Sequence, residues 1–106
     1  MKTSKYSAFA ALVLFSSVAF CEEHVVDQID KEFSETEITI KVGDEVHFKN
    51  EDRFFHNVFS LSDIKTFDLG SYPKGEQRSV KFDAAGEVKI ECAIHPDMQM
   101  TIKVEE

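Results

Sequence analysis

From Val25 onward, hydrophobic and polar residues alternate in short runs that are separated by turn residues. Ile38 and Ile40, for example, flank Thr39, and a Gly-Asp turn follows at 43–44. Similar alternation recurs in four further runs, at 46–49, 80–82, 88–92 and 100–104. Successive side chains of a strand point to opposite faces, so this pattern predicts half-buried strands. Several short strands with regular turns predict an all-β fold, an antiparallel sandwich or barrel.

Residues 1–21 show a different pattern, a continuous hydrophobic run preceded by two lysines. The apolar run at 8–20 is too short to span a bilayer comfortably. We therefore predict a cleaved signal peptide, with residues 22–106 as a mature periplasmic domain that has no transmembrane anchor. A bacterial lipoprotein signal with its lipid on Cys21 is the alternative, but Phe20 is bulky where such signals carry Gly or Ala.

The composition limits the number of domains and the class of partner. The chain has 106 residues, of which 12 are Lys or Arg and 20 are Asp or Glu, for a formal charge of −8. This length predicts one small domain, and we expect a monomer. So acidic a chain cannot neutralise a run of phosphates, which excludes nucleic acid as a partner. Loss of the signal peptide leaves Cys92 as an unpaired thiol in an oxidising compartment, and metal ligation explains such a thiol well.

One short segment carries the chemistry. Cys92, His95 and Met98 form a C-x₂-H-x₂-M motif after a predicted strand, and His56 begins an earlier strand. One thiolate, two imidazoles and a thioether make up the His₂Cys set with a weak axial Met that blue-copper electron-transfer sites use. Thiolate and thioether stabilise Cu(I), whereas imidazoles suit Cu(II), so this set accepts both oxidation states. The motif therefore predicts a copper site.

On these motifs the sequence resembles the cupredoxins, the plastocyanin/azurin family of blue copper proteins, and most closely its amicyanin-like members. The His-Asn-Val at 56–58 matches the upstream ligand motif, and the loop at 92–98 matches the short amicyanin-type ligand loop. The turn at 42–44 is also similar, so the resemblance covers the whole predicted mature domain. It implies a small Greek-key antiparallel β-sandwich, the cupredoxin fold, with one type 1 copper that cycles between Cu(I) and Cu(II).

The resemblance implies four copper ligands, with His56, Cys92 and His95 equatorial and Met98 axial. Met100 is the alternative axial ligand, because the longer plastocyanin-type loop places its Met farther from the histidine. Met100 also falls in step with the hydrophobic residues of the last strand, so that core packing explains it, whereas Met98 lies in the loop. We therefore expect Met98 as the axial ligand.

Neighbours of these ligands also receive roles. Asn57 is expected to hold the two ligand-bearing loops together by hydrogen bonds. Its usual partner in the family is a Ser or Thr after the Cys; this chain has Ala93, so only a backbone group can answer. Pro96 is expected to restrict the ligand loop. Phe54 and Phe55, just before the first ligand, belong either to the core or to an apolar rim of the site.

Two histidines lie outside the motif. If cleavage follows Cys21, the mature chain begins Glu-Glu-His, with His24 in third place. A free amine, two backbone amides and an imidazole form a square-planar nitrogen set for Cu(II), which predicts a second copper site at His24. His47 alternates with two hydrophobic neighbours and is predicted to face solvent.

Together these features predict a periplasmic carrier of single electrons, with a redox protein such as a c-type cytochrome or a dehydrogenase as its partner. The alternative is a periplasmic copper-tolerance protein that buffers or oxidises copper. We do not expect an enzyme: multicopper oxidases and copper nitrite reductases need further histidine clusters and more than one such domain. A zinc site is disfavoured by the thioether of Met98 in the fourth place.

Overall fold

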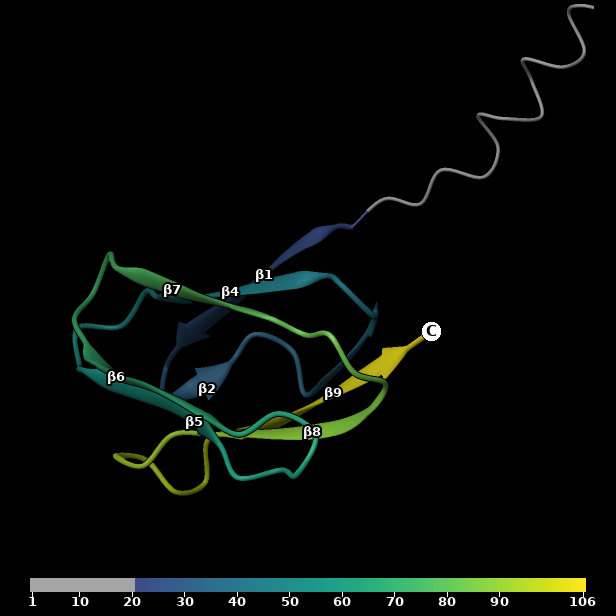
Figure 1. Cartoon of the computed structure of the whole chain (residues 1–106). Coiled ribbons are helices and arrows are strands. Elements are labelled where there is room, and N and C mark those ends of the chain that lie inside the picture. Colours follow the sequence, from purple (N-terminus) through teal and green to yellow (C-terminus); the bar gives the residue numbers. More distant parts are fainter. Residues whose placement is uncertain (1–20) are drawn as a thin grey trace, which may run out of the picture.

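The computed structural model describes residues 21–106, so the predicted signal peptide lies outside the described residues except for Cys21 (Figure 1). This part of the chain forms strands joined by turns, with no helix long and apolar enough to cross a membrane. The strands are β1 (Glu23–Ile29), β2 (Glu32–Phe33), β3 (Glu37–Lys41), β4 (Glu45–Asn50), β5 (His56–Ser60), β6 (Phe67–Tyr72), β7 (Gln77–Lys81), β8 (Gly86–Glu91) and β9 (Gln99–Glu105).

These strands form two sheets, which confirms the predicted all-β sandwich. One sheet has the order β2-β1-β4-β7 and the other has the order β3-β9-β8-β5-β6 (Figure 1). Most neighbouring strands pair antiparallel, as the predicted sandwich requires, whereas β1–β4 and β3–β9 are parallel pairs. Parallel neighbours need a long connection. Such a connection exists here, because intervening strands separate the members of each parallel pair along the chain.

The hydrophobic core lies between the two sheets and follows the predicted alternation. In β4 the inward residues Val46 and Phe48 are fully buried. In β8 the inward residues are Val88 and Ile90, and Cys92 continues the same buried face just beyond the strand. Alternate residues thus pack inside while their neighbours face solvent, as period-two patterning requires. This core fixes the ends of β5 and β8, where the candidate ligands lie.

A buried carboxylate holds the turn between β3 and β4. Gly43 has a φ of 99°, which favours glycine, and it is followed by Asp44, the residue just before β4. One oxygen of Asp44 accepts a hydrogen bond from the backbone N–H of Glu22 (2.8 Å). The other accepts from the N–H of Lys41 (2.9 Å) and from Nε2 of His24 (3.0 Å). The Glu22 hydrogen bond is the largest cause that lowers the pKa of Asp44 to about 2, followed by the bond from His24.

We expect Asp44→Asn to lower the free energy of unfolding at pH 7 by about 1.5–3 kcal/mol, the usual range for a hydrogen bond to a charged group. Since the pKa of Asp44 falls from an ordinary 3.8 to about 2 on folding, its contribution is complete above about pH 4. It disappears as the pH falls toward 2. Urea unfolding at pH 7, 3 and 2 measures this, and a deficit of unchanged size at pH 2 would contradict it.

Candidate metal centre

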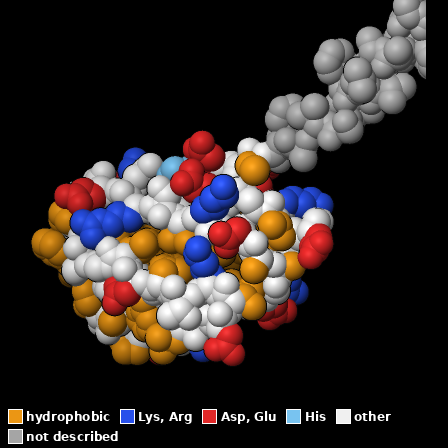
Figure 2. Space-filling model, in the orientation of Figure 1, with side chains coloured by type: hydrophobic (Ala, Val, Ile, Leu, Met, Phe, Trp, Pro, Cys, Tyr) orange, Lys and Arg blue, Asp and Glu red, His pale blue; other side chains and the backbone are white. Residues whose placement is uncertain are grey.

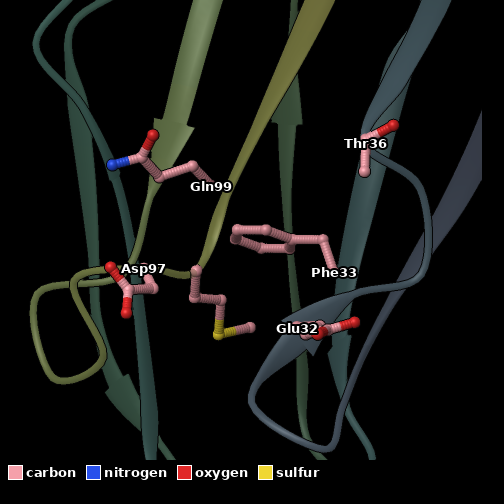
Figure 3. A pocket seen from close by; sticks show the side chains of 6 residues that line it. Glu32, Phe33, Thr36, Asp97 and Gln99 are labelled. Carbon is pink, nitrogen blue, oxygen red and sulfur yellow. The ribbon is translucent and has the colours of Figure 1, made fainter.

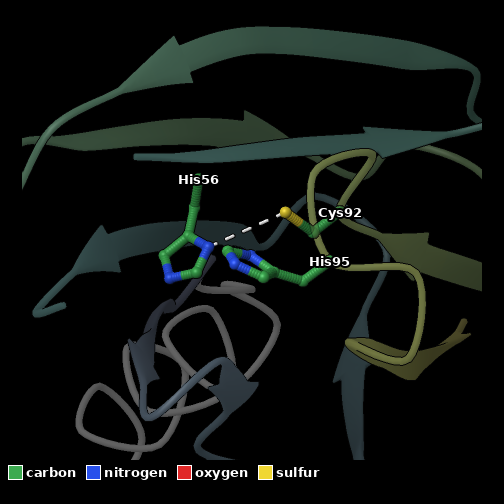
Figure 4. A group of neighbouring side chains, drawn as sticks. All are labelled: His56, Cys92 and His95. Carbon is green, nitrogen blue, oxygen red and sulfur yellow. Dashed lines mark hydrogen bonds between the residues drawn. The ribbon is translucent and has the colours of Figure 1, made fainter. Parts of the chain in front are cut away.

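Two neighbouring strands of the second sheet bring the predicted ligands together. His56 is the first residue of β5, and Cys92 directly follows β8, the strand beside β5. His95 lies three residues farther along, in the loop between β8 and β9. Figure 4 shows the three side chains converging from these elements. Their ligand atoms all lie within 4.8 Å of one another.

The donor atoms are spaced and buried as a metal site requires. Cys92 Sγ lies 3.7 Å from Nδ1 of His56, and both residues are buried. Metal–nitrogen and metal–sulfur bonds are each about 2.0–2.3 Å long, so one ion can reach both atoms. The rings of His56 and His95 lie 4.9 Å apart between centroids. Nδ1 of His95 is buried without a hydrogen-bond partner, so the cluster fits a metal that would take this lone pair.

Asn57 connects the two ligand-bearing segments. Its backbone N–H donates to Cys92 Sγ (3.4 Å), and its side-chain oxygen accepts from the N–H of Ala93 (3.4 Å). Its amide nitrogen donates to a carboxylate oxygen of Asp68 on β6 (2.9 Å). The partner in the Cys92 loop is thus a backbone group, as the alanine after the cysteine demands. These bonds fix the position of the sulfur relative to β5.

Asp52 is a further site residue, which the sequence analysis missed. Its carboxylate accepts hydrogen bonds from Nε2 of His56 (2.7 Å) and from the N–H groups of Asp30 (2.7 Å) and Lys31 (2.9 Å). Burial alone would raise the pKa of Asp52, but these hydrogen bonds outweigh it and lower the pKa. The ionised carboxylate keeps the ring proton on Nε2, so the lone pair of Nδ1 faces Cys92.

The same carboxylate shapes the turn between β1 and β2. Asp30 and Lys31 both have positive φ values, 54° and 62°, and two such residues form the tight turn of a two-residue hairpin. The left-handed region is costly for residues other than glycine, and Asp52 accepts both backbone N–H groups there. Asp52 therefore joins the His56 ring to a turn that carries a lysine beside the site.

His95 is held neutral by its surroundings. Burial is the largest cause that lowers its pKa, followed by the neighbouring His56 and the ammonium of Lys31. A neutral imidazole is the form that binds a metal ion. His95 thus offers its free Nδ1 lone pair near neutral pH.

Met98 and Met100 are both buried, with 1% and 3% exposure, so burial does not distinguish them. Their positions differ. The N–H of Met98 donates to the carbonyl of His95 (2.9 Å), and both residues line one surface hollow. Met100 lies within β9, paired with Ile90. Met98 also borders a pocket of about 200 Å³, whose other walls include Phe33 (Figure 3).

Exposed hydrophobic side chains flank the two ligands His56 and His95 along the chain, which answers the question left open for the two phenylalanines: both are exposed and neither belongs to the core. Phe54, Phe55 and Ile94 are all exposed, and the Phe54 ring lies 6.0 Å from the His95 ring. Figure 2 shows hydrophobic side chains gathered in the lower part of the view, where Figure 1 places β5, β6 and the β8–β9 loop. We call Phe54, Phe55 and Ile94 the apolar rim.

The other two residues with predicted roles, Pro96 and His24, lie at opposite ends of the sandwich. Pro96 is exposed and lines the hollow beside His95. His24 lies in β1 and is bonded to Asp44, where it forms a group of possible metal ligands with Glu22. β4 starts beside this group and ends at Asn50, two residues before Asp52, which contacts the Cys92 cluster through His56. His24 therefore lies at the opposite end of β4 from the Cys92 cluster.

Comparisons with known proteins point to one family. The model of the family "copper binding proteins, plastocyanin/azurin family" matches residues 21–105. No curated protein sequence matches the chain. Among solved structures, a reduced variant of amicyanin is 28% identical, with a TM-score of 0.74 over 85% of this chain and 88% of that one.

Two other solved structures differ in what they support. A copper-containing nitrite reductase from Thermus scotoductus SA-01 is 27% identical with a TM-score of 0.74, but this chain covers only 22% of that one. A purple cupredoxin from Nitrosopumilus maritimus is 21% identical, with a TM-score of 0.70 over 77% of this chain and 99% of that one. The latter identity supports the fold alone.

Proposed function

Because the chain belongs to the plastocyanin/azurin family of copper-binding proteins, we propose that it is a periplasmic type 1 copper protein that carries single electrons and is not an enzyme. The observation that carries the proposal is the convergence of buried His56 and Cys92 with partly buried His95, with Met98 in the same loop. These four residues are the proposed ligands. When bound, copper supplies a one-electron couple between Cu(I) and Cu(II).

The role of the surrounding residues is to keep the ligands still. Asp52 fixes the tautomer and ring position of His56, and the backbone of Asn57 donates to the Cys92 sulfur. Partners of this kind orient the ligands and tune the metal. Pro96 is proposed to restrict the loop that carries His95. A site that does not rearrange between oxidation states exchanges electrons with little reorganisation.

The apolar rim is the proposed docking surface for the redox partner. His56 and Cys92 are buried, whereas His95 is only partly buried and contacts Phe54. The His95 edge is therefore the shortest way for an electron to cross the protein surface. Exposed apolar patches of this kind mark protein interaction sites. A c-type cytochrome or a dehydrogenase is the proposed class of partner.

The spectrum of the purified domain after one equivalent of Cu(II) tests the proposal. We expect an intense blue thiolate-to-copper band, a reversible one-electron wave in voltammetry and rapid oxidation of the reduced protein by a c-type cytochrome. A nearly colourless complex with a square-planar nitrogen EPR signal would contradict the type 1 site. A blue protein that exchanges no electrons with any cytochrome or dehydrogenase would contradict only the carrier function.

The two methionines are distinguished by a pair of variants. We expect Met98→Ala to alter the blue spectrum and the reduction potential. Loss of the thioether would enlarge the adjacent pocket, which Met98 lines, and would let water reach the metal site. Met100→Ala removes a side chain packed within the sheet, so it should cost about 2–5 kcal/mol of stability with little change in the spectrum. Visible spectra and urea unfolding of both variants measure this; the reverse pairing of effects would assign the axial role to Met100.

Copper handling in the periplasm is the second candidate function. It is favoured by the group Glu22, His24 and Asp44, which gathers possible metal ligands away from the Cys92 cluster, and by the predicted copper site at His24. Copper-inducible expression and a copper-sensitive deletion strain would favour this function. Loss of an electron-transfer pathway on deletion, with normal copper tolerance, would favour the carrier.

A further inference from the structure

A second cluster of metal-binding side chains lies on the outer face of the sheet that contains β1 and β4. These strands are parallel, with Glu23 opposite Glu45 and Val25 opposite His47. Glu23, Glu45 and His47 therefore share one face, because residues two apart along a strand point the same way. Along β4, Asn50 lies about 10 Å beyond His47 and about 17 Å beyond Glu45 at the usual rise per residue, and Asn50 faces the core whereas the cluster faces outward. The cluster is thus separate from the Cys92 site.

Among the described residues, the partner that the two glutamate side chains share is His47. Like charges directly opposite each other destabilise a sheet. Glu23 and Glu45 nevertheless both turn toward His47, whose Nε2 lies 3.0 Å from one carboxylate and 3.7 Å from the other. Both glutamate side chains are well exposed, at 71% and 42%, whereas the His47 side chain is only 15% exposed. A cation between the carboxylates would relieve their repulsion without disturbing the core.

The other ring nitrogen of His47, Nδ1, also has a partner. The side-chain nitrogen of Gln77, on β7, lies 3.4 Å from Nδ1 of His47. A glutamine amide can donate or accept at this position after rotating its group. When a metal ion takes Nε2, the ring proton can therefore move to Nδ1 and be accepted by the Gln77 oxygen. Metal-bound histidines in proteins are generally supported in this way.

From this geometry we propose that Glu23, Glu45 and His47 form a surface site for a divalent transition-metal cation such as Zn²⁺ or Cu²⁺. Their three ligand atoms lie within 4.8 Å of one another. One imidazole and two carboxylates are donors that both ions accept. The net charge of −8 raises the local concentration of cations. The site is independent of the copper centre, and the proposal does not rest on the proposed function.

The neighbouring group around His24 is a weaker host for Zn²⁺. Asp44 is buried, and its two oxygens already accept backbone hydrogen bonds from Glu22 and Lys41. A cation there would compete with the bonds that hold the turn before β4. Within residues 21–106, the side-chain contacts of Glu23 and Glu45 are those with His47, so a cation there would break no bond to a turn. His24 therefore provides a matched control for the experiment.

The proposal is tested by isothermal titration calorimetry, in which Zn²⁺ is added to the copper-loaded protein. We expect one equivalent of Zn²⁺ to bind while the visible copper spectrum stays constant. His47→Asn should raise the dissociation constant for Zn²⁺ about tenfold or more. Each factor of ten corresponds to about 1.4 kcal/mol of binding free energy. Glu45→Gln should weaken Zn²⁺ binding by a smaller factor, and His24→Asn should leave it unchanged. Because the side chains of Glu45 and His47 lie on the outer face, the metal-free His47→Asn and Glu45→Gln variants should have melting temperatures close to that of the parent.

Several results would overturn the proposal. One is the absence of Zn²⁺ binding up to about 1 mM, a free energy of only about −4 kcal/mol. Another is binding that survives both His47→Asn and Glu45→Gln. Binding lost in His24→Asn and kept in His47→Asn would assign the ion to the inner group instead. Failure of the protein to turn blue with copper would contradict the proposed function. The zinc titration would still be interpretable, because it measures the heat of Zn²⁺ binding that depends on His47.

Discussion

Cys92→Ser is expected to abolish the intense blue absorption and the reversible one-electron wave. The sulfur of Cys92 is buried and lies 3.7 Å from Nδ1 of His56, so it is the proposed source of the thiolate-to-copper band. A serine side chain has no sulfur, and its hydroxyl is neutral at neutral pH, so it gives no thiolate-to-copper band and binds Cu(I) poorly. Loss of an outer partner of a ligand already costs about 10–100-fold in metal affinity, so loss of the ligand itself should cost more. Visible absorption and a competition titration with a Cu(I) chelator measure both effects.

The chain contains its own control for this experiment. Cys21 is the other free cysteine, and it is exposed. In the full chain, Cys21→Ser should leave the colour, the potential and the affinity for copper unchanged. The fold should survive Cys92→Ser, because the two side chains have similar shapes and the N–H of Asn57 can donate to the new hydroxyl as it does to the sulfur. A blue Cys92→Ser protein, or a colourless Cys21→Ser protein, would contradict the assignment.

The parts of the fold that were predictable are those encoded by local alternation. Val88, Ile90 and Cys92 are inward residues of one strand and its extension, and period two alone places them on one buried face. The spacing of Cys92 and His95 likewise depends on a single short loop. Residues close in the chain constrain one another through the backbone, so their pattern survives into the structure.

Features that depend on distant pairing were not predictable. The parallel register of β1 with β4 joins strands that are not consecutive, and no local pattern specifies it. Asp52 lies in a connecting segment without periodicity, and its partners at Asp30 and Lys31 are 22 and 21 residues away. β6 carries Gly70 with a φ of 76° inside a strand and lacks strict alternation. In each case tertiary contacts decide what the local sequence leaves open.

Asn50 belongs to this unpredictable group, and its replacement should have the largest effect on stability. It is fully buried at the end of β4. Its amide nitrogen donates to the carbonyls of Phe54 (2.8 Å) and Tyr72 (2.9 Å), and its oxygen accepts from the N–H of Asp52 (2.7 Å). These bonds fold the segment that carries Asp52 toward His56 and attach it to β6. Asn50 therefore positions the ligand end of β5 without touching the ligands.

We expect Asn50→Ala to lower the free energy of unfolding by about 3–5 kcal/mol, because each buried backbone group left without a partner costs about 1–3 kcal/mol. Copper affinity should fall as well, since Asp52 loses the bond that aligns it with His56. Lys49→Ala, on the adjacent residue, is the matched control: Lys49 is 40% exposed, and its ion pair with Glu51 is a surface pair worth about 0–1 kcal/mol. Urea unfolding and copper titration of both variants measure the two effects. Equal, small losses in the two variants would show that the Asn50 hydrogen bonds do not organise the site, and the alignment of His56 would then have to come from Asp52 alone.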